Sequence, residues 1–331
     1  MNDNAEIKKN FLNLNCDAET NKIKSEIQRI LSKQLKKRGI VVGLSGGIDS
    51  SVTVGLCQKT MGNNRVIALL MPERHSSDDT LDLSRMVADQ FGVQTIYEDI
   101  TQILEALGFY QRYDAAIQSI IPEYGKGWKS KIATSNILES KGFTFFSVIA
   151  ESPDGNIIKK RLDLKSYLEV VAATNFKQRT RKLLEYYHAD RLNYAVAGTP
   201  NRLEYDQGFF VKNGDGAADF KPIAHLYKSQ IYQLAEYLGV PEKIIKRPPT
   251  TDTYSLSQDQ DEFYFSLSYE KMDLCLYGKN NNIPVETIGE LTELTIEQVQ
   301  RVYKDIDQKR STTKYLHLPP VLVQKVPEIN I

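Results

Sequence analysis

The sequence predicts an α/β fold, in which helices flank a doubly wound, mostly parallel sheet and one inserted segment contains a β-hairpin. Apolar β-branched runs alternate with amphipathic segments in the N-terminal part of the chain, and a glycine- and serine-rich stretch follows the first run. The chain has 331 residues, of which 41% are hydrophobic, so it is long enough to bury a large core. We therefore expect a single domain over residues 1–331.

The first strand–helix–strand unit lies near the N-terminus. Apolar side chains at helical spacing predict a helix over residues 18–37, which Gly39 ends. The run IVVGL at 40–44 predicts a buried strand, residues 50–61 a helix, and RVIALLM at 65–71 a second strand. Because such a unit joins parallel strands, these segments predict the centre of a parallel sheet.

Further elements extend the sheet and its covering helices. A second helix–strand unit follows the first, and a long amphipathic helix leads into a last short strand. Thr295 and Gln298 form a capping box that begins the last helix. The other predicted bounds are helix 81–91, strand 93–98, helix 165–191, strand 194–198 and helix 226–238.

The alternation of strands and helices breaks over residues 108–164, which we interpret as an insertion. Two strand-like runs in it flank the stretch SPDG at 152–155, whose residue types favour a tight turn and so predict a hairpin. The C-terminal tail, residues 312–331, is interrupted by prolines and is predicted to be extended.

Charge and cysteine usage exclude several classes of protein. Lysine and arginine number 42, as do aspartate and glutamate, so no overall positive field attracts nucleic acid or an acidic membrane. The three cysteines, Cys16, Cys57 and Cys275, form no C-x-x-C pair, which argues against a disulfide framework and a structural zinc site. The N-terminus lacks an apolar signal region. We expect a cytoplasmic protein without nucleic-acid or membrane partners.

The stretch GLSGGIDSS at 43–51 is typical of an anion site. Glycines let a backbone approach a ligand closely, and the first amides of the following helix favour a phosphate group. No lysine follows the glycines, as it would in a Walker A loop, so phosphoryl transfer of the kinase type is not indicated. A turn without function is the alternative, but a chance match to S-G-G-x-D-S is expected only about once per million sites.

SGGIDS resembles the pyrophosphate loop (PP-loop) of the N-type ATP pyrophosphatases, and residues 175–252 are similar to the NAD synthase family. The latter stretch holds the family's Arg-x-Arg helix, Gly-Thr-x-x-x-x-Glu turn, Gly-Asp-Gly segment, Leu-x-Lys-x-Gln helix start and Pro-(Ser/Thr)-x-Asp turn. The resemblance implies a Rossmann-like, adenine nucleotide alpha hydrolase-like fold. It also implies an ammonia-dependent carbon–nitrogen ligase that adenylates the carboxylate of deamido-NAD and gives NAD, AMP and pyrophosphate.

The resemblance also implies a role for individual residues. Asp49, Lys228 and Glu204 would carry the chemical step, with Asp49 and Glu204 as ligands of Mg²⁺. The residues implied for ATP are Gly43, Leu44, Ser45, Gly46, Gly47, Ile48, Asp49, Ser50, Thr199, Lys228 and Thr250. Those implied for deamido-NAD are Arg179, Lys212, Asp215, Asp219 and, on a looser match, Lys314.

Family resemblance implies a homodimer. Glutamine-dependent members carry an amidase domain, for which we see no room before residue 40, so ammonia arrives free or from a separate glutaminase. Pro200, Thr253-Tyr254 and the insertion depart from the family pattern. They leave open the amidation of another carboxylate, such as a sugar uronate or natural-product acid, and a module that binds ATP without turnover is a further alternative. Asp273 is expected to be a charge on a helix surface.

Overall fold

The computed structural model describes residues 11–77, 79–134, 145–248, 254–256 and 267–329. Its main sheet has four strands in the order β3-β2-β1-β7, and every neighbouring pair is parallel. The strands are β1 (Ile40–Gly43), β2 (Val66–Leu70), β3 (Gln94–Tyr97) and β7 (Ala195–Ala197). The chain builds outward from β1 to β3 and then returns to the other side of β1. The order therefore reverses between β1 and β7, where open α/β sheets bind ligands.

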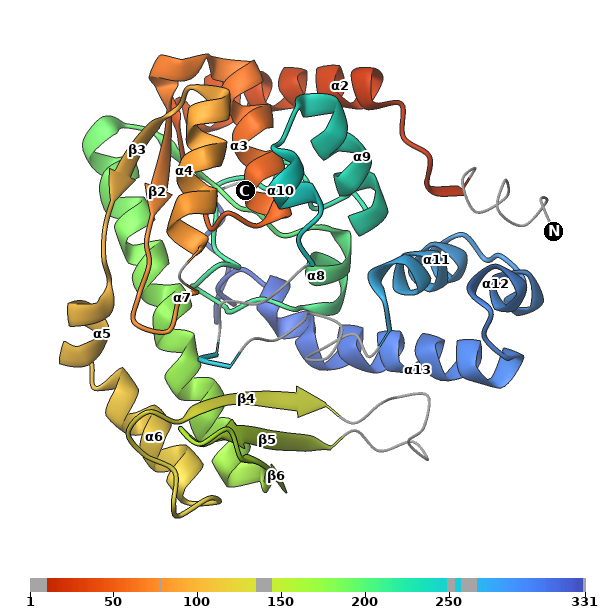
Figure 1. The fold of residues 1–331 in the computed structure, drawn as a ribbon. Helices are drawn as coiled ribbons and strands as arrows, with labels where there is room; N and C mark the ends of the chain where they lie inside the picture. The colour runs from red at the N-terminus through yellow and green to blue at the C-terminus, as the bar shows by residue number, and fades with distance from the viewer. Residues whose placement is uncertain (1–10, 78, 135–144, 249–253, 257–266, 330–331) are drawn as a thin grey trace.

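Both faces of this sheet are covered, as the apolar strands β1, β2 and β7 require. Ile40 and Val42 pack into one core with the helices α2 (Cys16–Arg29), α3 (Ile48–Met61), α4 (Thr80–Phe91) and α9 (Lys228–Leu238). Val41 points to the opposite core, which α5 (Thr101–Ala106), α6 (Phe109–Gln118) and α7 (Leu164–Leu192) cover. The predicted doubly wound α/β fold is confirmed (Figure 1).

The insertion contains a second, antiparallel sheet in the order β4-β5-β6. Its strands are β4 (Lys129–Thr134), β5 (Phe146–Glu151) and β6 (Ile157–Arg161). The predicted hairpin is β5–β6: the amide of Gly155 donates to the carbonyl of Ser152 at 2.9 Å, and Gly155 has φ +82°. The sequence did not predict β4, which is mostly polar. Figure 1 shows this sheet against α6 and the N-terminal part of α7, away from the parallel sheet.

The C-terminal part of the chain forms a third core. It consists of α8 (Arg202–Gln207), α11 (Tyr269–Asn280), α12 (Val285–Thr292) and α13 (Ile296–Thr313). The predicted capping box of α13 is present, because Gln298 and Thr295 exchange backbone–side-chain hydrogen bonds of 2.9 and 3.2 Å. Short elements complete the chain: η1 (Ile30–Leu35, a π-helix), η2 (Asn63–Arg65), α10 (Glu242–Ile245) and η4 (Lys314–His317).

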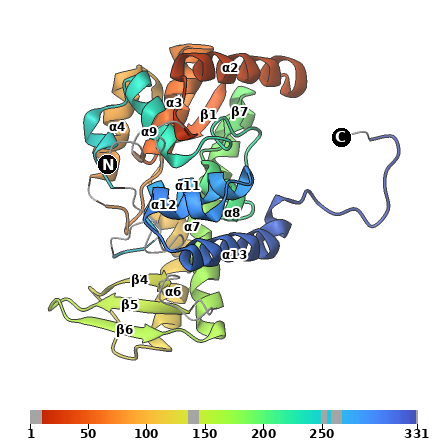
Figure 2. The ribbon, with the colours of Figure 1, turned by 90° about the vertical axis from the view of Figure 1, so that its right-hand side faces the viewer.

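Some boundaries differ from the prediction. The helix expected over 18–37 is α2 followed by one π-helical segment, which Lys36 ends in the left-handed conformation. The tail is helical as far as His317 rather than extended from residue 312, because its first proline is Pro319 and every earlier residue of the tail keeps its backbone donor. Beyond this point it runs away from the rest of the molecule (Figure 2). Within the ranges given above, no helix combines the length and apolar content of a membrane span.

Candidate active site

A cavity of about 390 Å³ opens at the carboxyl ends of the parallel strands. Its walls come from the loop after β1, the end of β2, the start of α4, one face of α7 and the segment between β7 and residue 215, together with Phe146 and Tyr254. It therefore lies at the reversal point of the sheet, where the fold places a ligand. Its volume is in the range of small-molecule sites.

The glycine-rich loop forms one wall of this cavity, and its backbone geometry requires glycine at Gly46. That residue has φ +71°, and a Cβ atom there would lie 2.8 Å from Cβ of Leu83. Within the loop, the amide of Ser45 donates to Oγ of Ser50 at 3.3 Å, and the amide of Gly47 donates to Oγ of Ser45 at 3.4 Å. Helix α3 begins directly after the loop, so its first amides and its positive dipole end face an anion bound there.

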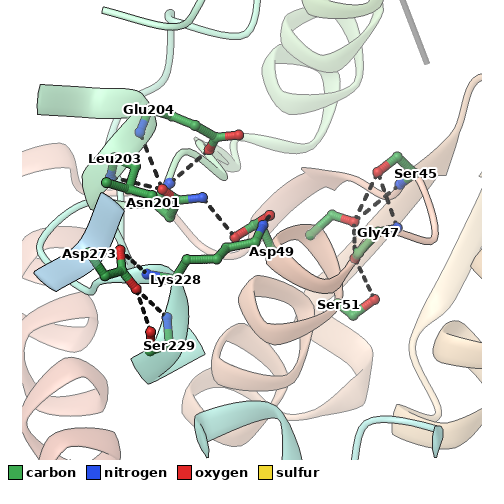
Figure 3. Close-up of polar contacts among 11 residues, drawn as sticks. Ser45, Gly47, Asp49, Ser51, Asn201, Leu203, Glu204, Lys228, Ser229 and Asp273 are labelled. Carbon is green, nitrogen blue, oxygen red and sulfur yellow. Dashed lines mark hydrogen bonds and ion pairs between the residues drawn. The ribbon is translucent and has the colours of Figure 1, made fainter. Parts of the chain in front are cut away.

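Asp49, in the first turn of α3, lies at the centre of a polar cluster (Figure 3). Its carboxylate forms an ion pair with Nζ of Lys228, and Nδ2 of Asn201 donates to its other oxygen at 3.1 Å. The Lys228 side chain is only 2% exposed, against 16% for Asp49. Burial disfavours the lysine cation, but the Asp49 and Glu204 carboxylates outweigh burial and raise the pKa of Lys228. The lysine is therefore held as a cation.

Glu204 is positioned by the capping box that begins α8. Its Oε2 accepts from the amide of Asn201 at 3.0 Å, while Oδ1 of Asn201 accepts from the amides of Leu203 and Glu204 at 2.9 and 3.2 Å. Enclosure by protein atoms, followed by the charge of Asp49, raises the pKa of Glu204 to about 8. Asn201 thus holds both carboxylates beside one another, and their repulsion favours a proton or another cation between them.

Asp273 holds the backbone of Lys228 in place through a hydrogen bond. The expectation that Asp273 is a charge on a helix surface is wrong. Its side chain is fully buried, where α11 packs against the start of α9. Its carboxylate accepts from the amides of Lys228 and Ser229 at 3.2 and 2.7 Å and from Oγ of Ser229 at 2.6 Å. Burial raises the pKa of Asp273 to about 6. It thus satisfies the first two amides of α9, which follow the N-cap residue Tyr227, and fixes the backbone of Lys228 (Figure 3).

The structure brings only some of the predicted ligand-binding residues together. Thr199, Glu204 and Asp215 line the cavity with most of the loop, but the predicted loop residues Gly46 and Ile48 do not line it. Thr250 lies outside the described residues. Lys228 does not line the cavity, but it forms an ion pair with Asp49, which does.

The remaining predicted residues lie outside the cavity walls. Nε of Arg179 donates to the carbonyl of Lys212 at 3.3 Å, and Nζ of Lys212 donates to the carbonyl of Tyr315 at 3.0 Å. Asp219 accepts from the amide of Val196 at 2.7 Å, which ties it to β7. Lys314 is exposed on η4.

Sequence reasoning missed a buried ion pair on the cavity wall, between Lys182 and Glu185 of α7. Nζ of Lys182 lies 2.6 Å from Oε2 of Glu185, and both side chains are less than a tenth exposed. Both face the cavity, as does Arg181, whose Nε donates to the carbonyl of Met71 at 3.2 Å. The helical period of α7 could have placed these residues on one face, but only the fold shows that this face meets the cavity.

Comparison with known proteins shows the family of this chain. The family model described as NAD synthase matches residues 19–138 and 152–313. An NH(3)-dependent NAD(+) synthetase of Rhizobium meliloti (strain 1021) is 58% identical over 298 residues, which cover 90% of this chain and 89% of that protein. One of Mesorhizobium japonicum is 54% identical over 318 residues, which cover 96% of this chain and 100% of that protein.

Solved structures show the same fold. The NH3-dependent NAD synthetase of Campylobacter jejuni, in complex with nitrate, has a TM-score of 0.61 at 23% identity and covers 94% of this chain and 100% of its own. An NMN synthetase of Francisella tularensis has a TM-score of 0.62 at 20% identity, with coverage of 94% and 99%. At these identities the likeness shows the fold alone. Together with the family model and the two relatives, it shows that this chain belongs to the NAD synthase family.

Proposed function

We propose that this chain is an ammonia-dependent NAD synthase. A carboxylate oxygen of deamido-NAD attacks the α-phosphorus of ATP and displaces pyrophosphate, which gives an acyl adenylate. The nitrogen of ammonia then attacks the acyl carbon and displaces AMP, and the proton that nitrogen loses passes to solvent. The observation that carries the proposal is the joint position of the glycine-rich loop, Asp49 and Glu204 in one cavity of a chain of this family. The relatives give no support to another carboxylate as acceptor.

The loop over residues 43–50 would hold the β- and γ-phosphates of ATP, which leave as pyrophosphate. The start of α3 supports this role, because the first amides of a helix have no partner within it and offer donors and a positive dipole where the leaving group gains charge. Lys228 would act on the α-phosphate, where charge develops as the carboxylate attacks. Thr199 and Thr250 would complete the ATP site.

Asp49 and Glu204 would hold Mg²⁺. Two carboxylates suit this ion, which prefers oxygen ligands and shares its coordination with phosphates and water. The raised pKa of Glu204 beside Asp49 supports the fit, because a divalent cation would relieve the same repulsion. When bound, Mg²⁺ would neutralise charge on the triphosphate.

The dinucleotide would contact Asp215 inside the cavity and Arg179, Lys212 and Asp219 beside it. The mutual contact of Arg179 and Lys212 supports a shared basic surface next to the cavity. Lys314 lies one residue from the Tyr315 carbonyl that Lys212 contacts, so it would reach the same surface.

We also propose a cytoplasmic homodimer. The exposed residues Leu164, Leu168, Leu183 and Tyr187 recur at helical spacing along α7, and a second copy would cover them. Analytical ultracentrifugation tests this proposal. We expect the wild type to sediment as a dimer and Leu183→Glu to shift toward the monomer. A wild type that sediments as a monomer would contradict the proposed dimer.

The nitrogen source and the acceptor are tested with the purified chain alone. We expect NAD to form from deamido-NAD, ATP, Mg²⁺ and ammonium chloride, and not when glutamine replaces ammonium. If ammonium fails but a separate glutaminase with glutamine succeeds, nitrogen is delivered by a partner. If neither yields NAD, the proposed function is wrong.

A further inference from the structure

The cavity follows α7 for much of its length and has two chemically different ends. Side chains of α7 that line it recur at helical spacing: Tyr167, Val171, Thr174, Gln178, Lys182 and Glu185. At 1.5 Å of rise per residue, the lining from Tyr167 to Glu185 spans about 27 Å. The charged end lies beside the glycine-rich loop, and the aromatic end lies toward the inserted sheet.

The aromatic end is built partly by the insertion. The ring of Phe146, at the start of β5, stacks on the ring of Tyr167 with centroids 4.1 Å apart and planes 19° from parallel. Both side chains line the cavity, as does the buried Tyr254. Phe146 lies in residues 139–151, the internal stretch that the family model leaves unmatched. Of these three wall residues, Phe146 is the one that lies outside the family match.

The other end of the cavity, beside the glycine-rich loop, also has apolar walls. Leu70 and Met71, at the end of β2, and Leu81, at the start of α4, line the cavity there. This apolar slot suits the base of a nucleotide whose phosphates lie on the loop. The aromatic end is then left for the second substrate, since ATP cannot occupy both ends.

We infer that Phe146, stacked on Tyr167, forms one wall of a subsite for a planar heteroaromatic ring of the dinucleotide acceptor. The inference rests on the proposed function and adds a specificity role for the inserted sheet. An aromatic wall binds any planar ring through stacking and dispersion, while the charged end of the cavity keeps the carboxylate near the α-phosphate.

Steady-state kinetics of Phe146→Ala test this role. Loss of one base–aromatic stack corresponds to a rise of roughly 5- to 150-fold in the KM for deamido-NAD. We expect no change in the KM for ATP and little change in kcat at saturating dinucleotide. Phe146→Tyr, which keeps the ring, should restore the wild-type KM, and Phe146→Leu, which keeps apolar volume without the ring, should not.

The matched control is Phe145→Ala. Phe145 is the neighbouring residue of the same type, is 38% exposed, packs on the guanidinium of Arg161 at 3.6 Å and is absent from the cavity wall. We expect wild-type KM values for it. The inference is overturned if Phe146→Ala leaves the KM for deamido-NAD unchanged, raises both KM values equally, or matches Phe145→Ala. A wild type without NAD formation would instead contradict the proposed function.

Discussion

The two sheets of this molecule differ in burial and in what they contribute to the site. Strand β2 of the parallel sheet is buried along its whole length, and the loop after β1 is fixed by glycine geometry. Strand β6 of the inserted sheet is largely exposed, and β5 alternates between half-buried and buried residues. A sheet with both faces covered holds charged groups in fixed positions, whereas a peripheral sheet accommodates change. We therefore propose that the chemical step takes place at the end of the parallel sheet and that the inserted sheet contributes to acceptor specificity.

The largest expected effect comes from Asp49→Asn. Removal of one carboxylate from the centre of the cluster should lower kcat by at least about 100-fold, in line with the loss of one electrostatic group in a preorganised site. Asp154→Asn, in the exposed turn of the inserted sheet, is the matched control and should have wild-type kcat. Similar losses of kcat in the two variants would contradict the proposal that the chemical step depends on the parallel sheet and not on the inserted sheet.

Lys228→Met should lower both activity and stability. It leaves the Asp49 carboxylate without its buried cation, and breaking such a pair costs about 3–5 kcal/mol of unfolding free energy. Urea denaturation measures this loss. Lys160→Met on the exposed strand β6 is the control, and we expect its unfolding free energy to stay close to that of the wild type. An unchanged stability of Lys228→Met would show that the ion pair contributes nothing.

Asp273→Ala should reduce stability with a smaller effect on the chemical step. It leaves the buried amides of Lys228 and Ser229 without their acceptor, at a cost of about 1–3 kcal/mol. Thermal unfolding measures the change. A lower kcat than that of Lys228→Met would contradict a purely supporting role.

Glu204 should make stability depend on pH in the absence of Mg²⁺. Its pKa in the folded chain, about 8, lies above the ordinary value of 4.5, so between these values the folded state binds more protons than the unfolded state. The unfolding free energy contributed by this group therefore falls as pH rises from about 4.5 to about 8. Urea denaturation with EDTA should show this fall in the wild type relative to Glu204→Gln.

Mg²⁺ should oppose that fall, because the ion binds ionised carboxylates. We expect added Mg²⁺ to raise the melting temperature of the wild type more at pH 8 than at pH 6, and to have little effect on Glu204→Gln. An equal rise in the melting temperature of the wild type and of Glu204→Gln would show that Mg²⁺ binds at another site.

The parts of the molecule that the sequence predicts well are local in the chain. The loop, Asp49 and the first strands lie within one short stretch, where residue type and period are sufficient. Asp273 was misjudged because it caps Lys228 across 45 residues, a contact that only the packing of α11 on α9 creates. Lys182 and Glu185 were missed because a helical period does not tell which face meets a cavity. Strand β4 was missed because its mostly polar residues carry no clear alternation.

The most direct test is ATP–pyrophosphate exchange, because it reports adenylation without the later attack of ammonia. We expect the wild type to exchange labelled pyrophosphate into ATP only when deamido-NAD is present, and Asp49→Asn to lose this exchange while it remains folded. Exchange in Asp49→Asn at the wild-type rate, or exchange in the wild type that does not depend on deamido-NAD, would contradict the assignment of the chemical step to this site.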